Sequence, residues 1–168
     1  MDLEKFTLKS QEAITGAQTK AIEYGHLEAD GEHLLLALLE QSDGLAPRLL
    51  QKLDVPVDSF VGRVRQELAG LPKVSGPGVE PGKVYVTKRL NQLLLKAHEE
   101  AGKMKDEYVS VEHLLLAFLE EGTKTPAGKI FKEFHISRDK FLNGLSTVRG
   151  NQRVTSADPE ASYEALQK

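Results

Sequence analysis

Apolar residues recur at helical spacing along the first half of the chain. A first helix is expected after Thr7, a good N-cap, and before Gly25, a natural stop, because apolar positions there repeat every three or four residues: Ala13, Ile14, Ala17 and Ala21. A second helix is expected from Asp30 to about Glu40. Its centre, Leu34 to Leu39, is apolar around the whole circumference, which predicts burial on all sides. Two further helices are expected, a short one around Leu49 to Leu53 and another from near Pro56 to Ala69.

The second half of the chain repeats this pattern. The nine residues from Glu32 to Glu40 return as Glu112 to Glu120 with a single change, Phe118 in place of Leu38. The residues before the two strings also correspond, because Thr87 and Ser110 occupy the capping positions of Thr7 and Asp30. After the string the offset slips by one residue, which indicates one insertion in a loop. The chain is therefore predicted to be one helical module duplicated.

The duplication predicts an all-α fold of about eight helices. A repeat of this length is too long for a solenoid, so two copies are expected to form one domain, 1–149, about a pseudo-twofold axis. Repeat one is expected at 1–70 and repeat two at 87–149, each with four helices. The connection at 71–86 is rich in Gly and Pro and reads as a mobile loop, with a short extended piece at 83–86.

The last segment, 150–168, is expected to be a mobile linker. Its first residues are polar and aperiodic, whereas Asp158-Pro159-Glu160 looks like the start of a helix that continues from Ser162 to Lys168. A helix that has just begun where the sequence stops predicts a piece of a longer protein.

Composition narrows the classes of function. The chain has 168 residues, enough for one domain that buries roughly 70% of its unfolded surface. The absence of cysteine excludes disulfides, thiolate metal sites and cysteine nucleophiles. A net charge of −3 disfavours nucleic-acid binding, and apolar runs of at most six residues disfavour a membrane span, which needs ~18. The N-terminus has no signal-peptide pattern.

The sequence contains no complete catalytic, cofactor or metal-binding motif. Gly82-Lys83 fails as a phosphate-binding loop because Pro77 and Val84 replace the required glycine and hydroxyl residue. His33 and His113 have no paired ligand on their helices, so we expect them at a partly buried rim. Glu32 and Glu112 are explained by the favourable helix dipole in a first turn, and no pair of acids is expected to be perturbed. We therefore expect a chain that is not an enzyme and holds no metal.

The remaining class is a binding module. Two modules seldom cover every apolar helix face, so an apolar strip left at the seam between them would bind an extended peptide or a partner helix. Two alternatives stay open. One is a structural or regulatory module that docks on another protein; the other is a small-ligand or metal-sensing domain with an enclosed polar pocket.

Several segments resemble a known family. The string Glu-His-Leu-Leu-Leu-Ala, which follows both Asp30 and Ser110, resembles the duplicated N-terminal domain of the Clp family of AAA+ unfoldases. Three further segments, 71–76, 106–110 and 149–155, resemble its bacterial disaggregases, and the last of them is the most specific. The resemblance covers essentially the whole chain.

The resemblance implies a substrate-recognition domain of an ATP-dependent disaggregase. The whole protein would be a cytoplasmic stress-response homohexamer with a coiled coil and two ATPase rings, working with the DnaK chaperone system. ATP and Mg would belong to those rings, and this fragment would be a non-catalytic monomer. It would bind exposed apolar segments of unfolded or aggregated polypeptides and pass them to the ring. In the structural or regulatory alternative, it would dock on an adaptor or on its own ATPase ring, as in a protease-linked Clp unfoldase.

The resemblance also names residues of a shallow substrate groove. Those tied to substrate binding in the family match Thr7, Leu94, Asp106 and Glu112 here. His113 takes a groove position that some members fill with leucine. A histidine would make that position more polar and pH-sensitive, because histidine titrates near neutrality.

Overall fold

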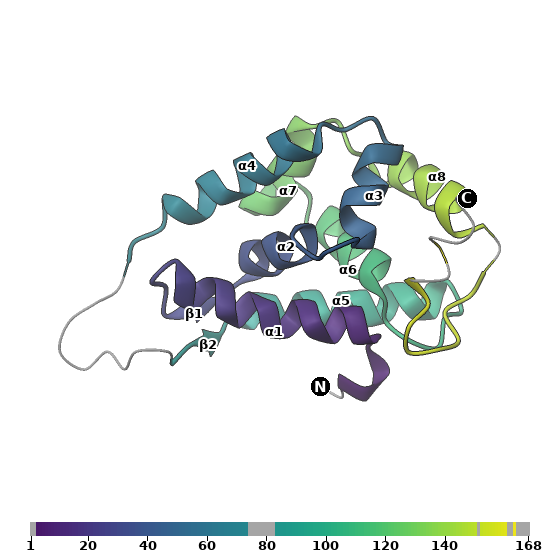
Figure 1. The fold of residues 1–168 in the computed structure, drawn as a ribbon, viewed down its shortest axis with the longest axis horizontal. Coiled ribbons are helices and arrows are strands. Elements are labelled where there is room, and N and C mark those ends of the chain that lie inside the picture. Colours follow the sequence, from purple (N-terminus) through teal and green to yellow (C-terminus); the bar gives the residue numbers. More distant parts are fainter. Residues whose placement is uncertain (1–2, 74–82, 151, 161–162, 164–168) are drawn as a thin grey trace.

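The described residues of the protein fold into two sets of four α-helices. The computed structural model describes residues 3–73, 83–150, 152–160 and 163. The first set comprises η1 (Leu3–Lys5), α1 (Leu8–Glu23), β1 (Glu28–Ala29), α2 (Gly31–Leu39), α3 (Leu45–Lys52) and α4 (Val57–Ala69). The second comprises β2 (Tyr85–Val86), α5 (Lys88–Lys103), α6 (Val111–Glu120), η2 (Gly122–Lys124), α7 (Pro126–Glu133) and α8 (Arg138–Arg149). The predicted all-α fold is confirmed (Figure 1).

Matching positions of the two sets have matching local geometry. The hydroxyl of Thr7 accepts a hydrogen bond from the Ser10 amide at 3.2 Å, and that of Thr87 accepts one from the Leu90 amide at 3.0 Å. Asp54 and His135, which follow α3 and α7, both have φ of 59°. The separation of Asp54 and His135 in the sequence is one residue larger than that of Thr7 and Thr87, as the predicted one-residue insertion requires.

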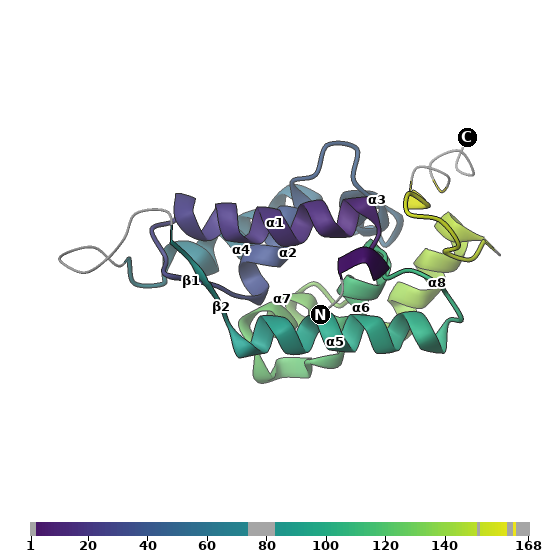
Figure 2. The same cartoon turned by 90° about the horizontal axis from the view of Figure 1, so that it is seen from below.

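The two central helices form the core. Every residue of α2 is buried, as are residues Val111 to Phe118 of α6, so the predicted all-round burial is confirmed. α1 and α5 run along one side of the molecule, the side turned toward the viewer in Figure 2. α1 packs on α2, and α5 packs on α6. The two most apolar helices are thus enclosed by the more polar ones.

Contacts between the two repeats are reciprocal. α3 packs on α8 and α6 of the second repeat, and α7 packs on α4 and α2 of the first. The approach of α8 to α3 requires a glycine, because a Cβ atom at Gly144 would lie 2.5 Å from Cδ2 of Leu53. One buried apolar cluster runs through both repeats. This pattern is what a pseudo-twofold axis between the copies produces.

Short parallel strand pairs also cross between the repeats. Ala29 of β1 pairs with Val86 of β2, and Phe6 pairs with Val109 at the corresponding positions of the other repeat. The Thr87 amide donates to the Ala29 carbonyl at 3.1 Å, and the matching bond joins Thr7 to Val109 at 2.9 Å. The extended piece expected at 83–86 is thus present as β2, whereas β1 has no signal in the sequence.

The described part of the C-terminal segment lies against the body of the domain, unlike the mobile linker predicted for it (yellow in Figure 1). Val154 and Tyr163 are fully buried, and Glu160 is 3% exposed. The Leu8 amide donates to the Ala157 carbonyl at 2.8 Å, and the Glu107 amide donates to the Val154 carbonyl at 2.7 Å. A polar, aperiodic sequence gave no signal for this docking because main-chain atoms make these bonds. We call residues 152–160 and Tyr163 the exit segment.

Two predictions fall partly outside the described residues. The Tyr163 amide donates to the Pro159 carbonyl at 3.3 Å, which fits the predicted helix start at Asp158. The rest of the predicted helix from Ser162 to Lys168 lies outside the described residues, as does the 74–82 part of the predicted loop at 71–86. The division into 1–70, 71–86 and 87–149 stays a prediction.

Candidate functional site

Four of the five residues predicted to bind substrate lie in one buried network, at the start of α6. The side chains of Asp106 and Glu112 are 0% exposed, and Thr7 and His113 are likewise buried. Contacts with the exit segment and with Arg149, the last residue of α8, join the four together. We call this network the α6 junction.

Asp106 is held by three partners in the α6 junction. It forms an ion pair with Arg149 and accepts a hydrogen bond from the Val154 amide at 2.9 Å. Nε2 of His113 lies 2.7 Å from its other oxygen, and Nδ1 of the same ring accepts from the Ser110 amide, so Nε2 is the donor. Burial alone would raise the pKa of Asp106, but these bonds hold it below its usual value.

Glu112 has more partners than its predicted helix-dipole role requires. It accepts hydrogen bonds from the Tyr163 hydroxyl at 2.9 Å and from the Ser110 hydroxyl, and its Oε2 lies 3.3 Å from Arg149. Burial first, and then the Glu112 carboxylate, raise the pKa of Tyr163 above its usual value. Glu112 therefore holds α8 and the exit segment to α6.

Glu160 brings a third carboxyl group to the α6 junction, beside those of Asp106 and Glu112. Its Oε2 accepts from the Thr7 hydroxyl at 2.7 Å and from the Val111 amide at 3.3 Å, while its buried Oε1 has no hydrogen-bond partner among the described residues. Burial, and to a lesser degree the charge of Glu112, raise its pKa to about 7, although the Thr7 bond acts in the opposite direction. The expectation that no two acids perturb each other is therefore wrong.

The corresponding glutamate of repeat one is held by a different arginine. Arg89, at the start of α5, donates to both oxygens of Glu32 at 2.7 and 2.8 Å and to Glu121 at 2.9 Å. The Ala127 amide, at the start of α7, donates to Glu32 at 3.0 Å. Arg89 and Arg149 carry no local sequence signal, because their partners come from other helices.

The two predicted rim histidines, His33 and His113, are in fact buried, with 1% and 0% exposure. In each, Nδ1 accepts the N-cap amide, so the histidine replaces the Glu or Gln of a capping box. Nε2 of His33 lies 2.8 Å from Nδ1 of His26, which occupies the position of Asp106. Burial first, and then the nearby His26, lower the pKa of His33 to about 4.

The fifth predicted residue, Leu94, lies apart from the α6 junction. It is on the inner face of α5 and only 5% exposed. Its neighbour Leu95 is 55% exposed. The predicted part of these five residues in substrate binding stays a prediction, and each of them has a structural reason for its place.

The centre of the seam between the repeats is packed rather than open. A void of only about 10 Å³ remains there, lined by residues that include Leu35, Leu115 and Phe141. The predicted open strip therefore does not lie at the buried centre. Six exposed large apolar residues lie instead on η1, α1, β2 and α5: Leu3, Leu8, Ile22, Tyr85, Val86 and Leu95. These elements run along the side of the molecule turned toward the viewer in Figure 2. We call these six residues the apolar face.

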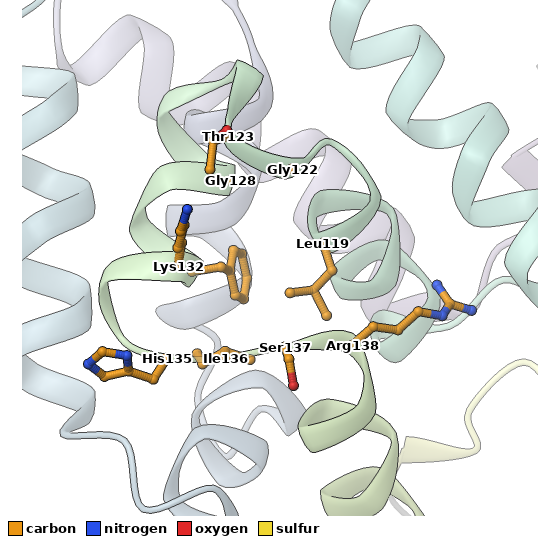
Figure 3. Close-up of a pocket in the computed structure, with 10 residues that line it drawn as sticks. Leu119, Gly122, Thr123, Gly128, Lys132, His135, Ile136, Ser137 and Arg138 are labelled. Carbon is orange, nitrogen blue, oxygen red and sulfur yellow. The ribbon is translucent and has the colours of Figure 1, made fainter.

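An open cleft lies within repeat two, between the end of α6 and α7. Its volume is about 340 Å³, and Leu119, Phe131 and Ile136 supply its apolar wall. Leu119 points from α6 toward α7, which carries Lys132 (Figure 3). Among the described residues no group of three or more His, Asp or Glu side chains is placed to hold a metal ion. No described helix has the length and apolar character needed to span a membrane.

Comparisons with known proteins find relatives that match the sequence over the whole chain. The chain is 52% identical over its whole length to the chaperone protein ClpB of Nitratidesulfovibrio vulgaris and 51% identical to that of Bacillus anthracis. It spans 19% of the length of each of these relatives.

Solved structures show the same architecture. The N-terminal domain of Hsp104 from Candida albicans superposes with a TM-score of 0.78 at 25% identity, covering 93% of this chain and 99% of that one. The N-terminal domain of the ClpV1 ATPase from E. coli, at 24% identity, shares the fold with a TM-score of 0.72, covering 94% of this chain and 92% of that one. The model of the Clp repeat N-terminal domain matches residues 5–134. The chain therefore belongs to the Clp repeat N-terminal domain family of ClpB and Hsp104 chaperones.

Proposed function

We propose that this chain is the substrate-recognition domain of an ATP-dependent protein disaggregase. It binds exposed apolar segments of unfolded or aggregated proteins and passes them to a hexameric ring. The observation that carries this proposal is the apolar face. Six of the seven exposed large apolar residues of the described chain fall in η1, α1, β2 and α5, which lie on one side of the molecule.

The apolar face suits weak and reversible capture. Its side chains are between 38% and 57% exposed, so each has area left to bury against a client. Full burial of one such side chain contributes about 1.5–3 kcal/mol, and the ordering of an extended client offsets part of this. Reversible binding raises the local concentration of clients without trapping them. A client needs only apolar side chains, so broad recognition of unfolded chains is expected.

The remaining steps belong to the rest of the whole protein. ATP and Mg act in its ATPase rings, and its homohexameric assembly, its cytoplasmic location and its cooperation with the DnaK system are part of the same proposal. The identity to ClpB chaperones supports a chaperone role for the whole protein. Within this chain, Leu94 supports the α5 backbone beneath Leu95, and the α6 junction fixes the start of α6 and the exit segment.

A charge on the apolar face tests the proposal. Leu95→Lys leaves the core intact, because the side chain is 55% exposed, and removes apolar area from the face. We expect about tenfold weaker binding of a permanently unfolded protein, measured by fluorescence anisotropy, with an unchanged melting temperature. The matched control is Leu71→Lys, which changes an exposed leucine, 43% exposed, outside the apolar face. Equal loss in both variants, or no loss in Leu95→Lys, would overturn the proposal.

A further inference from the structure

We propose that the exit segment is a releasable latch, docked on the α6 junction and controlled by the protonation of Glu160. The proposal concerns the described residues of this chain alone and does not rest on the proposed function. It gives Thr7, Asp106 and Glu112 a common task, which is to hold the exit segment in place.

The latch is attached by both main-chain and side-chain bonds. Main-chain bonds join Ala157 to Leu8 at the start of α1, and Val154 to Glu107 just before α6. Side-chain bonds join Tyr163 to Glu112 and Glu160 to the Thr7 hydroxyl. These contacts reach the starts of α1 and α6, so release of the latch would uncover the junction between the repeats. The bonds of Glu160 and Tyr163 with their partners bury polar groups that regain water on release.

Glu160 is the weak point of the attachment. One of its carboxyl oxygens is buried without a hydrogen-bond partner among the described residues, which is costly for an ionised carboxylate. Among the described residues no cation forms an ion pair with its carboxylate. Glu112 of α6 is acidic, and Tyr163 donates its hydroxyl to Glu112 rather than to Glu160. Arg149 of α8 is engaged by Asp106 and Glu112. Arg48 of α3 donates to the main-chain carbonyl of Glu160 at 3.2 Å, not to its carboxylate.

The sign of the pH dependence follows from this environment. Docking raises the pKa of Glu160 from an ordinary value of 4.5 to about 7, so the docked state binds more protons than the released state between these two values. Docking is therefore strongest at or below pH 4.5 and weakens as the pH rises toward 7. Between pH 5.5 and pH 8 the docking equilibrium is expected to fall roughly thirtyfold.

Amide hydrogen exchange of the 168-residue chain, followed by NMR, measures latch release. The reporters are the Val154, Leu8 and Glu107 amides, each of which bonds across the docking interface. After correction for intrinsic exchange rates, their protection should be roughly thirtyfold higher at pH 5.5 than at pH 8. The Thr87 amide is the internal control. It donates to the Ala29 carbonyl between β1 and β2 and makes no bond to the exit segment among the described residues, so its protection should not rise at pH 5.5.

Two variants separate the latch from general stability. Glu160→Gln keeps the shape of the side chain and removes its charge, so protection at Val154 should be high and differ less than about threefold between the two pH values. Tyr163→Phe removes one bond to Glu112 and should lower protection at both pH values while keeping the pH dependence. Equal protection at both pH values in the unmodified chain would overturn the proposal. An unchanged pH dependence in Glu160→Gln would overturn it as well.

Discussion

At the scale of single residues, one exchange between the repeats changes the chemistry of a shared structure. His33 and His113 both accept the N-cap amide of their helix through Nδ1. Nε2 of His113 meets the Asp106 carboxylate, whereas Nε2 of His33 meets a second histidine, His26. A carboxylate accepts a hydrogen bond from a histidine whether that histidine is neutral or protonated. Two histidines whose ring nitrogens lie 2.8 Å apart, in contrast, repel each other when both are protonated.

The histidine pair predicts sensitivity to acid in repeat one. The pKa of His33 in the folded state, about 4, is below its ordinary value of 6.5. The contribution of His33 to stability is therefore present above pH 6.5 and is lost as the pH falls toward 4. His26→Asp reproduces the pair of repeat two and should raise the pKa of His33 above 6.5, measured by NMR titration of the ring protons. A His33 that still titrates near pH 4 in this variant would contradict the account.

Sequence reasoning works at this scale only where the partner is local. Thr7 and Thr87 were identifiable as caps because the amides that they accept lie three residues further along the chain. Glu160 and Tyr163 gave no signal, since Tyr163 bonds to Glu112, 51 residues away, and Glu160 to Thr7, 153 residues away. Their unusual environments arise from the docking of the exit segment, which a polar and aperiodic stretch of sequence does not reveal.

At the scale of elements, each repeat supplies a short strand to the other. The residue before the cap of α1, Phe6, pairs with Val109, and the residue before the cap of α5, Val86, pairs with Ala29. Each pair is too short to be stable alone, so burial must hold it. Phe6 is 1% exposed, whereas Val86 is 38% exposed. The pairing before α1 is therefore anchored by the core, and the pairing before α5 forms part of the apolar face.

Removal of the Phe6 ring tests the anchored pairing. Phe6→Ala should lower the free energy of unfolding by about 3–5 kcal/mol, because it leaves a cavity in the core. The amide of Val109, which donates to the Lys5 carbonyl at 2.8 Å, should lose protection from hydrogen exchange with it. Leu3→Ala is the control, since Leu3 is 45% exposed, and it should change the free energy of unfolding by less than about 0.5 kcal/mol. A normally protected Val109 amide in Phe6→Ala would contradict the role of this pairing.

The helices were predictable because their signals are periodic and repeated. The all-round apolar string predicts the buried position of both α2 and α6, and the duplication predicts the second set of helices from the first. β1 was not predictable, because a two-residue strand has no period and exists only through its pairing with β2.

At the scale of the whole molecule, the pseudo-twofold arrangement fills the centre with side chains and leaves the apolar face on the outside. The reciprocal contacts of α3 with α8 and of α7 with α4 close the seam, and only a small void remains at its centre. The residues left exposed are not symmetric: Leu95 of α5 corresponds to Thr15 of α1, and Leu8 of α1 to Lys88 of α5. The duplication therefore accounts for the fold, and the differences between the copies account for the apolar face.

The sequence predicted an open apolar strip at the seam between the repeats, and the structure leaves no such strip at the buried centre. A seam between two apolar modules favoured an open strip, yet side chains such as Phe60, Phe131 and Phe141 fill that space. Which apolar residues remain exposed depends on the angles at which the helices cross. The spacing of apolar residues along a single helix does not determine those angles.

The most direct test of the account is NMR mapping of the isotope-labelled chain titrated with a permanently unfolded protein and, separately, with its folded form. The account predicts chemical-shift changes that concentrate in η1, α1, β2 and α5 with the unfolded form and are absent with the folded form. Shift changes confined to the cleft between α6 and α7, or equal changes with both forms, would contradict the claim that the apolar face captures unfolded chains.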